Sequence, residues 1–339
     1  MNSLTFSRST WLNSLHMTSL TVALMESEGH SRESILEGSG ITGDDLLDLR
    51  RLVSPWQEQQ VFANVQNLAG EPALGLRLGV RTRITAYGLL GYALISAPTL
   101  GEALRIGLSY PVLLGTYFHL ALEVDGDMAW LVATGYGEEE ELRPFNTELC
   151  LGSLKVACAD LLGQPLPLVR AEFDYTGPAD RCAAYATLFG CQLDFDCPRS
   201  AIGFPASWLD MRLPLADAVT HREMLEQCRR QNIDLAARRA WLDKVRAILG
   251  ERLQEPPGLE ELARRLNCSS RSLRRHLQQQ QTSYQQLLDE LRFARAKELL
   301  QDGDMPIYRI AEELGFSETA SLRHAFQRWS GQPPSHFRA

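Results

Sequence analysis

The sequence lacks any apolar run long enough to cross a membrane. A membrane-spanning helix needs about 18 consecutive apolar residues, whereas the most apolar segment, 87–97, is short and contains two glycines. The first residues, Met1–Asn13, are polar and show no cleavage pattern of a secretory signal. These absences lead us to expect a cytoplasmic protein with no membrane partner.

Closely spaced cysteines are also missing. The seven cysteines form an odd set, and no two of them have the C-x-x-C spacing of a zinc site or a redox centre. The sequence contains no G-x-S-x-G, H-E-x-x-H or G-x-x-x-x-G-K-[ST] motif, so the commonest hydrolase, metalloprotease and phosphate-loop signatures are absent. We therefore expect reduced thiols, no metal, no cofactor and no enzymatic activity.

Lysine is scarce, since only 3 of the 34 basic residues are lysines, and the charge is unevenly distributed. Residues 231–339 carry 17 Lys and Arg against 14 Asp and Glu, a net charge of +3. Residues 1–230 carry 17 against 28, a net charge of −11. A chain of 339 residues predicts about two domains. A polyanionic partner would therefore bind the C-terminal third.

The N-terminal two thirds mix helical and alternating patterns. An Asp-Gly-Asp turn at 125–127 separates two alternating segments and predicts a β-hairpin. We expect helices over 86–96, 99–114, 144–163 and 179–189, and strands over 116–124, 128–134, 169–175, 192–195 and 201–204. The prediction is an α+β domain over residues 1–207.

A linker or dimerisation helix is predicted over 208–235, with Pro214 near its start. Its apolar stripe consists of Leu215, Val219, Met224, Leu225 and Cys228. Such a stripe on a connecting helix serves either domain packing or a dimer seam. We expect Leu215, Val219, Leu225 and Cys228 to form a buried seam between the subunits of a homodimer.

The strongest signal is an internal repeat. Leu259, Leu262, Ala263 and Leu266 form one apolar helical face, and Ile307, Ile310, Ala311 and Leu314 repeat that spacing 48 residues later. A turn follows each face, with Asn267 or Gly315 suited to the left-handed conformation. Ser269 and Ser317 are then predicted as N-caps of a second helix in each copy.

Helix, short turn and capped helix together predict a helix-turn-helix unit, and two copies make the prediction specific. Arginine reads guanine edges and also binds phosphate, so exposed arginines on the second helices indicate a DNA partner. The candidate DNA-binding residues are Arg271, Arg274 and Arg275 in the first copy and Thr319, Ser321, Arg323, His324, Gln327 and Arg328 in the second.

A long helix, Tyr284–Leu300, is predicted between the two copies. A rigid helix there would let both units enter successive major grooves about 34 Å apart. The complete prediction is an α+β sensor domain followed by an all-α DNA-binding domain over 236–339, with two helix-turn-helix units joined by a long helix.

Residues from about 238 to 339 resemble the DNA-binding domain of AraC-type transcriptional regulators. The resemblance is carried by the segments 259–266, 269–277, 291–296, 310–317, 325–329 and 331–338. It implies base contacts from both second helices, by position from Arg271, Arg274 and Arg275 and from Ser321, Arg323 and His324. It also implies a promoter activator that works with RNA polymerase. Leu322 and His324 depart from the commoner Phe and Arg, and a neutral imidazole cannot make the bidentate guanine contact.

The N-terminal domain is similar to the effector-binding domain of the subgroup that includes ornithine-utilisation regulators. The segments 72–79 and 87–104 carry this similarity. It implies a small-molecule effector, such as an ornithine-like amino acid, whose binding rearranges the dimer or frees the linker.

An amino-acid effector would need an anion for its ammonium group and an arginine or helix N-terminus for its carboxylate. We expect one pocket if the hairpin packs against the helix that follows Pro144. The candidate effector-binding residues are Tyr87, Tyr117, Trp130, Arg143, Asn146 and Glu148.

An alternative function stays open, namely an enzyme such as a DNA-repair transferase fused to a DNA-binding module. Cys197, followed by Pro198 and Arg199, superficially resembles the reactive cysteine of DNA-repair alkyltransferases. It lacks the neighbouring histidine that those enzymes use to activate the thiolate, which disfavours the alternative.

Overall fold

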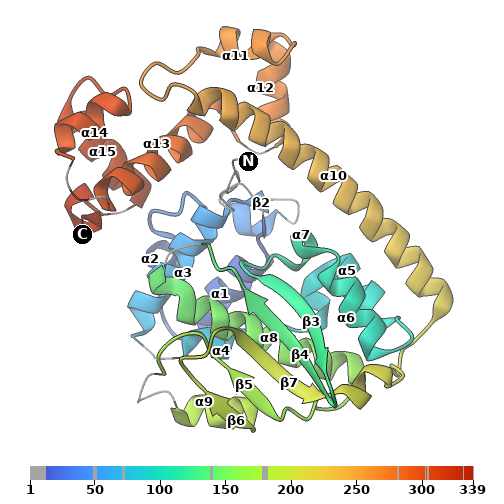
Figure 1. Cartoon of the computed structure of the whole chain (residues 1–339). Helices are drawn as coiled ribbons and strands as arrows, with labels where there is room; N and C mark the ends of the chain where they lie inside the picture. The colour runs from blue at the N-terminus through green and yellow to red at the C-terminus, as the bar shows by residue number, and fades with distance from the viewer. Residues whose placement is uncertain are drawn as a thin grey trace.

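A computed structural model describes residues 13–48, 52–70, 73–137, 140–177, 182–280, 282–301, 303, 305–330 and 332–338. An N-terminal α+β body and a smaller C-terminal helical body are connected by one long helix (Figure 1). Each body has its own apolar core, and the helical body has two small ones. No helix in the described ranges is both long and apolar enough to span a membrane.

A five-stranded sheet forms one layer of the N-terminal body. Its strands are β3 (His119–Asp125), β4 (Met128–Thr134), β5 (Arg170–Glu172), β6 (Gln192–Asp194) and β7 (Ser200–Pro205), in the order β3-β4-β7-β5-β6. Only β5 and β6 pair in parallel. The expected hairpin is confirmed, because Asp125 pairs with Met128 around the predicted turn. A short pair, β1 (Asn13–Ser14) and β2 (Leu52–Val53), is antiparallel.

Helices cover one face of this sheet (Figure 1). They are α1 (His16–Ser27), α2 (Arg32–Leu36), α3 (Pro55–Ala69), α4 (Leu74–Gly79), α5 (Gly88–Ile95), α6 (Leu100–Leu108), α7 (Pro111–Leu114), α8 (Arg143–Leu162) and α9 (Cys182–Phe189). The predicted helix over 99–114 is in fact two helices. The break fits Pro111, whose ring cannot donate the hydrogen bond that a continuous helix needs.

The helix α4 packs unusually close to α8 because its glycines leave room. A Cβ on Gly75 would lie 2.2 Å from the carbonyl oxygen of Phe145, and one on Gly79 would lie 2.8 Å from that of Leu149. Glycine at both positions therefore permits the backbones to touch. This contact fixes α8, the helix that carries several residues of the candidate effector site.

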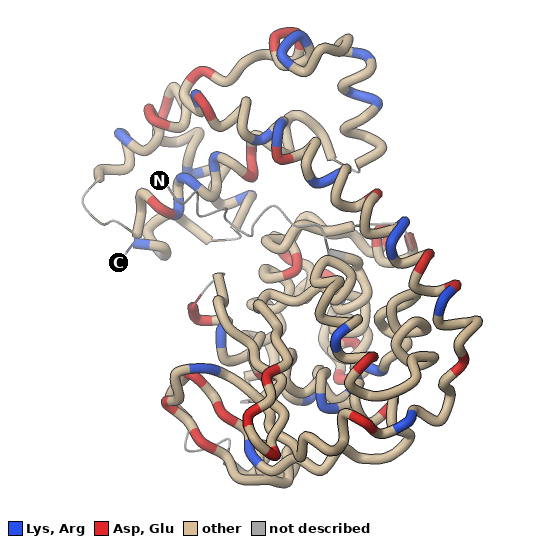
Figure 2. Tube along the Cα trace, turned by 45° about the vertical axis from the view of Figure 1, so that its right-hand side comes forward, with Lys and Arg blue, Asp and Glu red and all other residues tan. Residues whose placement is uncertain are grey.

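The connection between the bodies is α10 (Ala218–Gly250), a single helix of 33 residues. Asp217 caps its start by accepting a hydrogen bond from the Thr220 amide at 2.7 Å. Acidic and basic residues mix along the helix (Figure 2), and intrahelical ion pairs such as Arg230–Glu226 and Arg238–Asp234 support it. The predicted linker helix therefore exists, but it begins at Ala218 and not near residue 208, and it runs on without a break into the C-terminal body.

The apolar stripe of α10 is divided. Cys228 is buried and Leu225 is half-buried, and both pack on the core of the N-terminal body. Leu215, just before the helix, is 63% exposed, and Val219 is 73% exposed. The prediction of one continuous buried seam is therefore wrong. Leu225 and Cys228 pack within the chain, and only Leu215 and Val219 face outward.

The C-terminal body contains the two predicted helix-turn-helix units. The first is α11 (Leu259–Arg265) with α12 (Ser270–Gln279), and the second is α14 (Ile307–Glu313) with α15 (Thr319–Ser330). The predicted joining helix is α13 (Tyr284–Gln301). Leu262, Ala263, Ile310 and Ala311 are all buried, as the repeat predicts.

Candidate DNA interface and candidate effector cavity

The first helix-turn-helix unit has the turn and the cap that the sequence predicts. Asn267 adopts a left-handed conformation with φ of 54°. The Ser269 side chain accepts a hydrogen bond from the Ser272 amide at 3.1 Å, which satisfies one of the free donors at the start of α12. Leu273 and Leu277 then anchor α12 in the core.

The opposite face of α12 presents basic side chains to solvent. Arg271, Arg274 and Arg275 are exposed, and none of them forms an ion pair with an acid in the described ranges. Arginines on the preceding helix differ, because Arg265 pairs with Glu251 at 2.6 Å and with Glu261 at 3.0 Å. The α12 arginines therefore keep their charge available for a polyanion.

The turn of the second unit is one residue longer than that of the first. Gly315 has φ of 75°, and a Cβ there would lie 2.3 Å from the carbonyl oxygen of Gln254. Its recognition helix α15 begins at Thr319, so the residue directly before it is Glu318 and not Ser317. The N-cap prediction for Ser317 is wrong, and the one extra residue in this turn explains the difference.

The face of α15 divides between two surroundings. Ser321, Arg323, His324 and Gln327 are exposed, and Thr319 is half-buried. Arg323, His324 and Gln327 line a surface groove together with Pro333 and Arg338. Arg328 instead pairs with Asp289 of α13 at 3.0 Å and lines a cavity between the two bodies.

Three of the six candidate effector residues line one small cavity of about 60 Å³. Tyr87, Tyr117 and Asn146 line it, together with Cys150 and Ser153 of α8. Burial raises the pKa of the Tyr87 hydroxyl to about 12, although a hydrogen bond with Ser153 acts in the opposite direction. Burial likewise raises the pKa of the Cys150 thiol to about 12. Both groups are therefore neutral near pH 7.

Trp130, Arg143 and Glu148 lie elsewhere, which corrects the expectation of one pocket lined by all six. Trp130 alternates with the core residues Ala129 and Leu131, so it projects from the opposite face of the sheet. Arg143 pairs with Glu140 and Asp174. The buried Glu148 carboxylate accepts a hydrogen bond from the Tyr185 hydroxyl at 2.5 Å.

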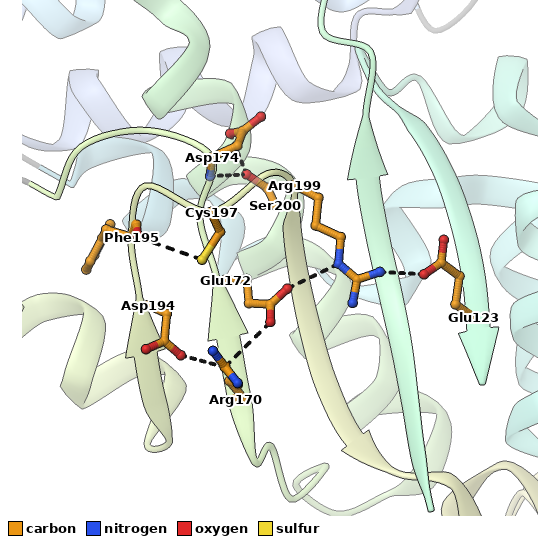
Figure 3. A network of polar contacts seen from close by, with 9 residues as sticks. All are labelled: Glu123, Arg170, Glu172, Asp174, Asp194, Phe195, Cys197, Arg199 and Ser200. Carbon is orange, nitrogen blue, oxygen red and sulfur yellow. Dashed lines mark hydrogen bonds and ion pairs between the residues drawn. The ribbon is translucent and has the colours of Figure 1, made fainter. Parts of the chain in front are cut away.

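The outer face of the sheet holds a network of ion pairs (Figure 3). Arg199 bridges Glu123 and Glu172, and Arg170 bridges Glu172 and Asp194. The Arg199 guanidinium also lies 5.0 Å from the centre of the Trp130 ring. The two arginines offset most of the charge of the three carboxylates on β3, β5 and β6, so Trp130 belongs to a structural network.

Cys197 lies at the edge of that network. Its thiol is 3.7 Å from the carbonyl oxygen of Phe195, and no described contact joins it to a histidine (Figure 3). A nucleophilic cysteine needs a base or cation that stabilises the thiolate. Among the described residues no group of three or more His, Cys, Asp and Glu side chains has the arrangement of a metal site.

Sequence reasoning missed the most informative residue of the cavity, Glu58 of α3. Its side chain lines the cavity and the residue is only 2% exposed. One carboxylate oxygen accepts a hydrogen bond from the Tyr117 hydroxyl at 2.6 Å, and the other from the Thr18 hydroxyl at 3.2 Å. The signal was present, because Glu58 shares a helical face with Val61, Phe62 and Val65, where a carboxylate is out of place.

Comparisons with known proteins agree with this architecture. Residues 29–213 match the family described as the arabinose-binding domain of AraC transcription regulator, N-terminal, and residues 262–339 match a helix-turn-helix domain. The chain is 35% identical over 315 residues to the ornithine utilization regulator of Pseudomonas aeruginosa, covering 93% of both proteins.

Two further similarities come from the same organism. The chain is 28% identical over 271 residues to the HTH-type transcriptional regulator VqsM, which covers 78% of this chain and 83% of that protein. The crystal structure of the transcriptional regulator CdpR aligns over 87% of this chain and 95% of that chain, with 26% identity and a TM-score of 0.45.

Proposed function

Because this chain belongs to the AraC family of transcriptional regulators, we propose that it activates a promoter when an ornithine-like amino acid binds its N-terminal domain. It is a DNA-binding regulator with an effector domain, and its relatives carry the names of regulators. We further propose that it acts as a dimer in the cytoplasm and that it has no catalytic activity.

DNA reading is assigned to both recognition helices, with α12 as the stronger reader. Its three exposed arginines are free of ion pairs with described acids, and guanine accepts two hydrogen bonds from such a side chain. On α15 the assigned residues are Thr319, Ser321, Arg323, His324 and Gln327. Arg328 would first have to leave Asp289, so it contributes least to the proposed interface.

Selection of bound duplexes from a random pool tests the DNA part. The full-length protein should enrich one sequence with two half-motifs spaced about one helical turn apart, or about 34 Å. Its affinity should fall steeply with salt, because neutralised phosphates release counterions. An affinity that does not depend on salt would contradict this assignment.

The effector assignment rests mainly on Glu58. A buried carboxylate that lines a cavity, where it accepts hydrogen bonds from two hydroxyl groups, is suited to a ligand ammonium group. Asn146 and Ser153 offer polar contacts for the other end of an amino acid. At about 60 Å³ the cavity is small for an amino acid, so binding requires side chains such as Tyr117 to move.

A pair of ligands isolates that ammonium group. L-Norvaline has the carbon chain of L-ornithine without the side-chain amine, so ornithine should raise the melting temperature of the protein more than norvaline does. Glu58→Gln should abolish this difference, whereas the exposed Glu102→Gln should preserve it. Equal effects of both ligands on the wild-type protein would reject Glu58 as the ammonium site.

Homodimerisation is proposed through the outward part of the α10 stripe. Leu215 and Val219 are exposed next to α5, whose Leu89 and Tyr92 are 39% and 57% exposed. Together they form an apolar surface of the kind that marks an interface. Val219→Arg should give a monomer by light scattering, and an unchanged mass would place the dimer contact elsewhere.

Activation further requires contact with RNA polymerase.

A further inference from the structure

A second and larger cavity, of about 510 Å³, lies between the N-terminal body and the DNA-binding domain. Its volume falls in the ~300–1,000 Å³ range of small-molecule sites. The loop 38–40 and the start of α3 form one wall, and α10, α13 and α15 form the other. The cavity does not share its lining with the candidate effector cavity.

The wall from the N-terminal body is held in place. Ser54 and Gln57 form a capping box at the start of α3, and the Gln57 side-chain amide donates to the carbonyl oxygen of Ser39 at 3.2 Å. Trp56 lies between these two residues and reaches across to α13. Its ring meets Phe293 edge-on, with ring centres 5.6 Å apart.

The opposite wall is aromatic at one end and charged at the other. Phe293 also meets Trp329 of α15 at 5.9 Å, so three aromatic rings surround the apolar end. At the charged end Arg246 pairs with Glu290 at 3.1 Å, and Arg328 pairs with Asp289 at 3.0 Å. The formal charges of these four groups cancel.

Polar atoms on this wall are buried without a hydrogen-bond partner in the described part of the chain. They are the indole Nε1 of Trp329, the Nη1 of Arg246 and the Oε1 of Gln280. Trp329 and Arg246 are 6% and 7% exposed, and Arg246 Nη1 lies 3.8 Å from Asp243 Oδ1, beyond hydrogen-bond distance. An unpartnered buried group costs about 1–3 kcal/mol, so each of them needs an explanation.

We propose that this cavity is a second ligand site and that it binds a small hydroxylated aromatic carboxylate. Its ring would lie against Trp56, Phe293 and Trp329 at the apolar end. Its carboxylate would accept hydrogen bonds from two donors that have no hydrogen-bond partner among the described residues, Trp329 Nε1 and Arg246 Nη1, and its hydroxyl would donate to Gln280 Oε1. This ligand would touch both bodies at once. The existence of this site does not depend on the DNA-binding and effector roles proposed above.

Titration of the full-length protein with the three hydroxybenzoate isomers tests the proposal, with calorimetry and tryptophan fluorescence as readouts. At least one isomer should bind saturably with a Kd below about 1 mM, and benzoate, which lacks the hydroxyl, should bind more weakly. Absence of saturable binding by all three isomers would overturn the proposal.

Variants from both walls locate the site. Trp329→Phe keeps an aromatic ring, although a smaller one, and removes the indole N–H donor. It should weaken binding about tenfold, as should Trp56→Ala in the other body. Trp208→Phe, outside the cavity lining, is the matched control and should bind like the wild type. Wild-type affinity in both wall variants would overturn the proposal.

Gln280→Ala provides a test that does not disturb the core, since Gln280 only ends α12. It should abolish the preference for hydroxybenzoate over benzoate while leaving benzoate binding within about twofold of the wild type. If Gln280→Ala still prefers hydroxybenzoate over benzoate as the wild type does, Gln280 does not bind the hydroxyl and the proposed contact is overturned.

Discussion

The two helix-turn-helix units share a repeat but differ in their cores and in their surfaces. The first has an aliphatic core around Leu262, Leu273 and Leu277, and α12 presents arginines that have no acidic partner among the described residues. The second has an aromatic core in which Phe293 contacts Phe326 and Trp329, and its Arg328 is held by Asp289.

Their relation to the N-terminal body differs as well. Trp56 of the N-terminal body packs on the aromatic core of the second unit, so this unit contacts the N-terminal body directly. The apolar residues packed on the core of the first unit come from the C-terminal body itself. Exposed arginines without an acidic partner among the described residues lie on α12, whereas contact with the N-terminal body is made around α13 and α15.

The cores should differ in the cost of truncation. Phe326→Ala removes a fully buried ring and should lower the free energy of unfolding by about 3–5 kcal/mol. Leu277→Ala, at the matching position of the first unit, should lower the free energy of unfolding by about 2–5 kcal/mol. We expect this loss to be smaller than the loss in Phe326→Ala. Chemical denaturation followed by fluorescence measures both, and a larger loss for Leu277→Ala would reverse the comparison.

The recognition helices should differ in what they read. Arg275→Ala should weaken specific DNA binding by about 1–3 kcal/mol and relax preference at one or two adjacent base pairs. His324→Ala should cost less, because a neutral imidazole makes a weaker contact with the base. Competition binding over single-base operator variants compares them. A larger change in base preference for His324→Ala would make α15 the dominant reader.

The N-terminal body should lose stability at alkaline pH. Burial raises the pKa values of Cys150 and Cys158 to about 12, from an ordinary value near 9. Between these values the unfolded chain releases protons that the folded chain retains, so stability falls as the pH rises above about 9. Cys158→Ala should flatten the decline in melting temperature between about pH 8 and pH 11. An equally steep decline in this variant would argue against a buried neutral thiol.

The smallest effect is expected at the Arg328–Asp289 pair. Arg328 is 65% exposed, so Arg328→Ala should change stability by less than about 1 kcal/mol. Specific DNA affinity should change less than in Arg275→Ala, because the pair holds the guanidinium on α13. A loss of affinity equal to that of Arg275→Ala would show that Arg328 leaves Asp289 to bind DNA.

The C-terminal body could be predicted closely because its information is local and periodic. Spacing of three and four residues gives the buried faces, and residues such as Asn267 and Ser269 determine the turn and the cap. The error at Ser317 arose from one inserted residue, which shifts the second helix of this unit from an offset of 48 to one of 49 residues. The partner of Arg328 depends on a tertiary contact 39 residues away, which no local pattern contains.

The effector cavity was predicted only in part for the same physical reason. The cavity is formed by tertiary packing, which brings together Tyr87, Tyr117 and Asn146 from separate segments. Sequence alone does not specify which side of a strand faces such a cavity. Trp130 was placed on the wrong face for this reason. Glu58 could have been found, because a carboxylate at an apolar helix position is a local anomaly.

The unbroken α10 gives the protein a mechanical property. A helix of 33 residues is about 50 Å long at 1.5 Å per residue, and its first half packs on the N-terminal body while its second half enters the DNA-binding domain. A tilt of only about 10° at the packed end would sweep the far end through about 9 Å, a quarter of a DNA helical turn. A small change in how α10 packs on the N-terminal body would therefore shift the DNA-binding domain along the double helix.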